Sequence, residues 1–71
     1  MALSNTFGAL KAEINLAREM LTDLVHSKTR ANELLDGELK QNVTNCLDMA
    51  IRELKVGLEK MEREAIRVLN S

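Results

Sequence analysis

Asp23 and His26 are residues of the kinds that bind metal ions, and they are spaced three residues apart, as two ligands on one helix face would be. Four-helix di-metal proteins place a carboxylate and an imidazole on one helix face at the same separation of three residues. Such ligands must point into the bundle and be joined by further glutamates, whereas this pair lies about 140° or more from the apolar seam of its helix. We therefore expect a solvent-exposed pair and no metal site.

Cys46 is the only cysteine of the chain and the only candidate nucleophile of its kind. It falls on an apolar helix face, so the sequence predicts a buried, unreactive thiol. The three glycines, Gly8, Gly37 and Gly57, are isolated and form no phosphate-binding loop, and there is no Ser–His–Asp set. We expect no catalytic residue, no cofactor and no enzyme activity.

His26, Lys28 and Arg30 form a short basic cluster that, with Lys11 and Arg18, has the charge to contact phosphates. Ten Lys and Arg are, however, balanced by eleven Asp and Glu, and the formal net charge is -1. Nucleic-acid binders are typically basic and, for single strands, carry stacking aromatics, whereas this chain has one phenylalanine and neither tyrosine nor tryptophan. The composition favours a solvated polar stretch over a nucleic-acid site.

The composition also indicates the elements that position these residues. The 71-residue chain has no proline and is rich in helix-forming residues, and this predicts an all-α fold of one domain. From Leu3 the apolar residues alternate in steps of four and three, which is a heptad seam and favours a left-handed supercoil. The members of this first seam are Leu3, Phe7, Leu10, Ile14, Ala17, Leu21 and Leu24.

The second half of the chain has a wider apolar face, covering about 140° of a helical wheel. Its residues are Leu39, Val43, Cys46, Leu47, Ala50, Ile51, Leu54, Gly57, Leu58, Met61, Ala65, Val68 and Leu69. A face of this width needs more than one neighbouring helix. Three oppositely charged pairs four residues apart, Asp48 with Arg52, Glu59 with Arg63 and Lys60 with Glu64, are expected on the solvent side.

Asp36 and Gly37 predict the turn between the helices, because glycine adopts the left-handed conformation that ends a helix. The expected helices then cover about 4–35 and 38–70, with the turn near 36–37. A turn within the polar stretch 26–32 is the alternative, and it would place Gly37 inside the second helix.

A lone two-helix hairpin buries too little apolar surface to offset its chain entropy. We therefore expect a homodimer in which two antiparallel hairpins form a four-helix bundle. In outline this is similar to the small plasmid copy-number RNA-binding proteins, whose dimer consists of two hairpins. The residues expected in the core and dimer interface are Phe7, Leu10, Ile14, Leu21, Leu24, Val43, Leu47, Ile51, Leu54, Leu58 and Met61.

Four apolar residues lie outside the two seams: Leu16 and Met20 in the first half, Met49 and Val56 in the second. They complete the bundle core or, with His26 and Arg30, form a surface that binds a partner.

The function that the sequence favours is a small cytoplasmic protein–protein interaction module. It would be an antagonist or adaptor that inhibits or modulates another protein, for example a bacterial transcription regulator. The lone cysteine fits a reducing compartment, and no segment is long and apolar enough to span a membrane. The alternatives are an RNA-binding helical-hairpin dimer and a structural self-assembly subunit.

Overall fold

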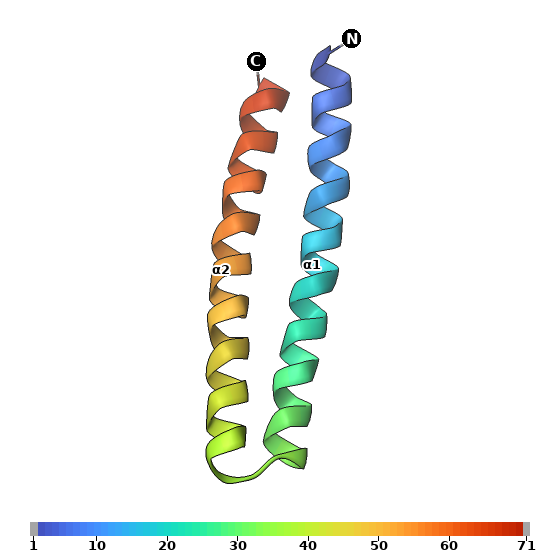
Figure 1. Ribbon diagram of the computed structural model, residues 1–71. Helices are drawn as coiled ribbons and strands as arrows, with labels where there is room; N and C mark the ends of the chain where they lie inside the picture. Colours follow the sequence, from blue (N-terminus) through green and yellow to red (C-terminus); the bar gives the residue numbers. More distant parts are fainter. Residues whose placement is uncertain (1, 71) are drawn as a thin grey trace.

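Two long helices make up the fold. The computed structural model describes the backbone of residues 2–70 and the side chains of residues 6–70. This part of the chain consists of α1 (Ala2–Leu34) and α2 (Gly37–Asn70) and contains no strand. The helices lie side by side and antiparallel, with the turn at the bottom of Figure 1. The predicted all-α helical hairpin is confirmed.

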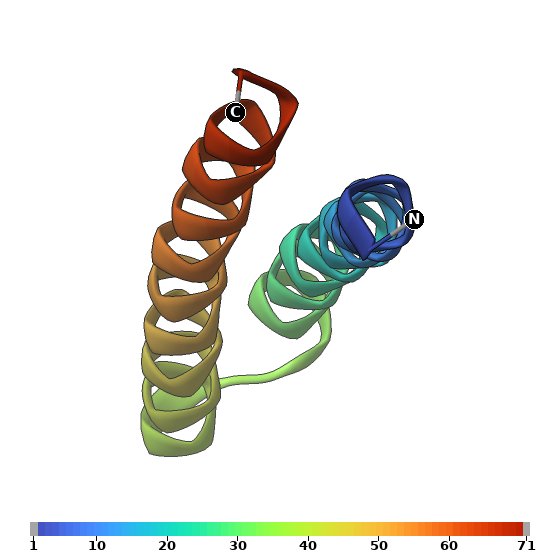
Figure 2. The same ribbon diagram turned by 90° about the horizontal axis from the view of Figure 1, so that it is seen from above.

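The hairpin is a thin rod of 53 × 15 × 12 Å. Its length follows from the 33 residues of α1 and the 34 of α2, because a helix rises about 1.5 Å per residue. Seen from above, the two helices are inclined to each other (Figure 2), as expected when apolar residues repeat at a heptad spacing.

Leu35 and Asp36 connect the helices, one residue earlier than the expected turn at 36–37. The Leu35 N–H donates to the Ala31 carbonyl at 3.0 Å, and the Lys40 N–H donates to the Asp36 carbonyl at 3.3 Å, so Asp36 opens α2. Gly37 has a φ of 62°, a conformation that residues with a Cβ rarely adopt. Since α1 continues through residues 26–32, the alternative turn there is wrong.

The core between the helices is small. Among the residues whose side chains are described, five are buried: Ile14, Ala17, Ala31, Ala65 and Val68. Three of these are alanines, which contribute little apolar area. The seam residue Leu3 lies outside the described side chains.

The remaining seam residues are half-buried, which means that water reaches part of each side chain. They are Phe7, Leu10, Leu21, Leu24, Leu35, Val43, Leu47, Ile51, Leu54, Leu58 and Met61. Two helices in contact can shield each seam from one direction only, so the hairpin by itself leaves the sides of the seam open.

Candidate interaction surface

On either side of the seam, each helix presents one flanking residue per heptad. Because α1 and α2 are antiparallel, the residues that follow Ala17, Leu47 and Met61 meet on one side of the hairpin. On this side Arg18 forms an ion pair with Glu62 across the seam, with 2.6 Å between Nη2 and Oε2. We call this side the polar flank.

A second ion pair crosses the seam near the turn. Lys28 Nζ lies 2.5 Å from Asp48 Oδ1, and Asp48 belongs to the polar flank. This pair replaces the expected pairing of Asp48 with Arg52, because the seam position of Lys28 directs its side chain towards α2. The polar flank thus joins the helices by charge at two levels of the rod.

The opposite side consists of residues that directly precede a seam residue. Several of them are apolar, although Asp23, Ser27 and Arg30 interrupt the apolar residues along α1. In the antiparallel alignment of the helices, Met20, Ser27 and Leu34 of α1 fall on the same side of the hairpin as Gly57, Ala50 and Val43 of α2. Leu16, Leu39 and Cys46 border the same strip. We call the set Leu16, Met20, Leu34, Leu39, Val43, Cys46, Ala50 and Gly57 the apolar flank.

The large side chains of the apolar flank are well exposed. The exposed fraction is 52% for Leu16, 55% for Met20, 76% for Leu34 and 59% for Leu39. A Cβ placed on Gly57 would meet nothing within 4 Å, so the surface above this glycine is open. The apolar flank is therefore a strip of bulky side chains around small residues, and the hairpin itself does not cover it.

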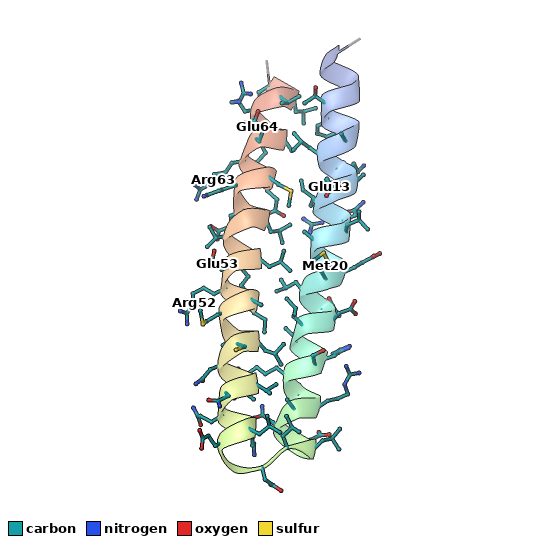
Figure 3. All side chains as sticks on the ribbon, in the orientation of Figure 1. Glu13, Met20, Arg52, Glu53, Arg63 and Glu64 are labelled. Carbon is teal, nitrogen blue, oxygen red and sulfur yellow. The ribbon has the colours of Figure 1, made fainter. Side chains whose placement is uncertain are left out.

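At the end of the hairpin away from the turn, the apolar flank stops at two acidic residues. Glu13 precedes Ile14 and Glu64 precedes Ala65, so both occupy the apolar side of the seam; Figure 3 labels them with Met20. Arg67 Nε donates to Glu64 Oε1 at 2.9 Å. This hydrogen bond, and then the charge of Arg67, lowers the pKa of Glu64, and the carboxylate raises the pKa of Arg67.

The residues predicted to bind a partner are divided among three surfaces. Leu16 and Met20 belong to the apolar flank. Met49 and Val56 are exposed one above the other on the side of α2 that faces away from α1. His26 and Arg30 are exposed on α1, and Arg30 Nη2 donates to Ser27 Oγ at 3.3 Å, towards the apolar flank. Leu16, Met20 and Arg30 lie on the same side of α1, with Arg30 about 21 Å along the helix from Leu16, and the other three lie elsewhere.

The residues predicted for the core and dimer interface all lie along the seam or at its edge. Ile14 is buried, and Phe7, Leu10, Leu21, Leu24, Val43, Leu47, Ile51, Leu54, Leu58 and Met61 are half-buried.

The expectation of a buried Cys46 is wrong, because its side chain is exposed. Leu39, Ala50 and Leu69, assigned to the same wide face, are exposed as well. One neighbouring helix covers only part of a 140° face, and these residues lie towards or beyond its edges. Of the other charge pairs expected along α2, Glu59 with Arg63 is confirmed at 3.8 Å, whereas Glu64 pairs with Arg67 instead of Lys60.

The basic cluster is not a single patch. Lys28 is engaged by Asp48 and Arg18 by Glu62, while His26 and Arg30 lie four residues apart on the outside of α1. Within the described residues, no group of three or more His, Cys, Asp and Glu side chains is placed to hold a metal ion. The same part of the chain contains no helix that is long and apolar enough to cross a membrane.

The chain matches no protein-family model, no curated protein and no solved structure with which it was compared.

Sequence reasoning missed Leu34, although it is more exposed than the four off-seam residues that were singled out. Its signal was present: Leu34 follows Met20 by fourteen residues, which is two heptads, so both have the same position relative to the seam. The polar residue Ser27 at the intermediate position interrupts the pattern on α1, and only the register with α2 shows that Ala50 and Val43 continue the apolar strip.

Proposed function

We propose that this protein is a non-enzymatic interaction module that binds another protein through the apolar flank and thereby inhibits or modulates it. The observation that carries the proposal is that four large apolar side chains on one side of the rod, Leu16, Met20, Leu34 and Leu39, are 52–76% exposed. Proteins in water rarely leave a large contiguous apolar surface uncovered unless it serves binding. The homodimer and the cytoplasmic location expected from the sequence belong to the same proposal.

The shape of the apolar flank favours a helix as the bound element. The flank is straight, and between Leu16 and Leu34 it extends for about 27 Å of helix axis. A partner helix with apolar residues at every third or fourth position would place them over Ala50 and Gly57, between the larger side chains. The flexible thioether of Met20 allows the surface to adapt to different side chains. A helical segment of a transcription regulator is one example of such a partner.

An RNA-binding function has less support. Phosphate contacts require free cationic side chains on one surface, whereas Arg18 and Lys28 are neutralised by carboxylates of α2. The exposed His26 and Arg30 supply too little charge for a nucleic-acid site by themselves.

The experiment is an affinity purification from source-cell lysate with and without nuclease, using a matched pair of variants. Replacement of Leu16 and Met20 with Asp places two charges on the apolar flank. Replacement of Val25 and Ile66 with Asp makes the same charge change at 45% and 59% exposed residues away from it. We expect a stoichiometric protein to be captured by the wild type and by the Val25/Ile66 variant, and to be lost with the Leu16/Met20 variant.

Nuclease treatment separates the alternatives. Capture that survives nuclease supports the interaction module. Capture that disappears with nuclease would support the RNA-binding hairpin instead. Equal capture by both variants would contradict the assignment of the apolar flank as the binding surface.

A further inference from the structure

The hairpin exposes more surface than a protein of its mass does when folded alone. A monomeric globular protein of 8.0 kDa exposes about 4,450 Å², whereas this hairpin exposes 5392 Å². The difference of roughly 900 Å² is close to the ~800 Å² that each partner buries in an interface of standard size. One interface along the rod would therefore bring the exposed area to the ordinary value.

The apolar flank has the symmetry that contact with an identical copy requires. Ser27 and Ala50 lie at its middle, and the larger residues Met20 and Leu34 lie one heptad before and after Ser27 on α1. On α2, Val43 and Gly57 lie one heptad before and after Ala50. A two-fold axis near Ser27 and Ala50 thus brings Met20 towards Leu34 of a second copy, and Val43 into the open space above Gly57 of that copy.

The charges select one of the two ways in which two flanks can meet. If the turns of both copies lay at the same end, Asp23 of one copy would approach Glu53 of the other, and Glu13 would face Glu64, whose carboxylate is already paired with Arg67. If the turns lie at opposite ends, the carboxylates are separated by most of the length of the rod.

The antiparallel arrangement also pairs opposite charges at the rim. Arg30 and Asp23 lie on the border of the apolar flank, on either side of Ser27. The two-fold axis brings Arg30 of each copy towards Asp23 of the other. Within its own chain Asp23 has no ion-pair partner among the residues that the structure describes.

We propose that a second copy of this chain covers the apolar flank, with the two turns at opposite ends and with α1 stacked on α1 and α2 on α2. The inference rests on the proposed function of the apolar flank as the binding surface. Self-association and the binding of another protein then use the same residues. A heterologous helix must displace the second copy, so the dimer is the resting state of the module and dissociation exposes its binding surface.

Single-cysteine variants test the arrangement. In a Cys46→Ala background, Ala50→Cys places two thiols near the two-fold axis, and mild oxidation should give a covalent dimer. Met20→Cys in the same background is the control, because its two thiols would lie about 21 Å apart along the helix axis. Failure of Ala50→Cys to cross-link, in a protein whose mass in solution is that of a dimer, would contradict the antiparallel arrangement.

Charge exchange tests the rim contact independently. Arg30→Asp should weaken self-association roughly tenfold, since two symmetric ion pairs are replaced by repulsion. Asp23→Arg added to Arg30→Asp should restore it, because the exchanged charges meet only between chains. No recovery in the double variant would overturn the assigned contact.

The mass in solution separates this inference from the proposed function. A wild-type protein that stays monomeric at millimolar concentration would exclude the second copy as the occupant. The capture of another protein through Leu16 and Met20 would remain unaffected by that result, and loss of that capture alone would refute the proposed function while the dimer stands.

Discussion

The polar flank and the apolar flank lie on the same two helices, yet they differ in what joins the helices across the seam. On the polar flank, Arg18 reaches Glu62 and Lys28 reaches Asp48, so these charged side chains find partners inside the chain. On the apolar flank, Met20 is 55% and Leu34 76% exposed. Charged residues can remain in water after pairing, whereas exposed apolar residues gain free energy only by contact with another apolar surface. The polar flank is joined by ion pairs within the single chain, and the apolar flank is the side that we propose a partner covers.

The seam that both flanks share should be the most sensitive part of the molecule. Leu21→Asp forces a carboxylate between α1 and α2 and should lower the free energy of unfolding by about 3 kcal/mol or more. Circular dichroism during urea titration measures this effect, with Asn15→Asp on the exposed face as the control. If Leu21→Asp and the control unfolded at the same urea concentration, the heptad assignment would be wrong.

Two glycine substitutions test whether anything packs on the apolar flank, with Gly8 as a position outside it. A Cβ on either Gly8 or Gly57 meets no atom within 4 Å in the hairpin, and alanine is favoured over glycine in a helix by about 1 kcal/mol. Gly8→Ala should therefore raise the free energy of unfolding by about 0.5–1 kcal/mol. Gly57→Ala should gain less, or lose stability, because its methyl group occupies space that the second copy fills. Equal gains in chemical denaturation would mean that nothing packs on Gly57.

The ion pair between Arg18 and Glu62 should contribute less, because the two side chains are 58% and 38% exposed. A double-mutant cycle with Arg18→Ala and Glu62→Ala should give a coupling free energy below about 1 kcal/mol, and it should shrink in high salt. A coupling free energy of several kcal/mol would contradict the weak, solvent-exposed ion pair that we assign to the polar flank.

The smallest expected effect is the pH dependence from Glu64. Its pKa is lowered in the folded chain by Arg67, so its stabilisation is present above the unfolded pKa of about 4.3 and is lost as the pH falls through the folded value. Urea midpoints of the wild type and Glu64→Gln should differ slightly near pH 6 and converge at strongly acidic pH. If the difference between the two urea midpoints grew as the pH was lowered, the stabilising role assigned to ionised Glu64 would be wrong.

The hairpin was predictable because the steps of three and four along each half of the sequence require a partner helix, and Gly37 marks the turn. The position of Cys46 was not predictable in the same way. An apolar residue at the edge of the seam looks the same in the sequence whether or not a second pair of helices covers it.

The apolar flank itself required the register between the helices. Leu34 and Val43 are separated by a turn in the sequence, and Met20 and Gly57 by more than half of the chain. Only the antiparallel alignment shows that they share one side. The choice of Leu16 and Met20 followed from the sequence, whereas Met49 and Val56 were chosen by the same criterion and lie on another surface.

Sedimentation equilibrium of the wild type and the two matched Asp variants tests the central claim most directly. We expect the wild type and the Val25/Ile66 variant to have the mass of a dimer, and the Leu16/Met20 variant to dissociate roughly 100-fold more readily, because its new carboxylates would be buried in the interface. The same dimer in all three proteins, or a monomeric wild type at every concentration, would contradict the assignment of the apolar flank as the surface that a second copy covers.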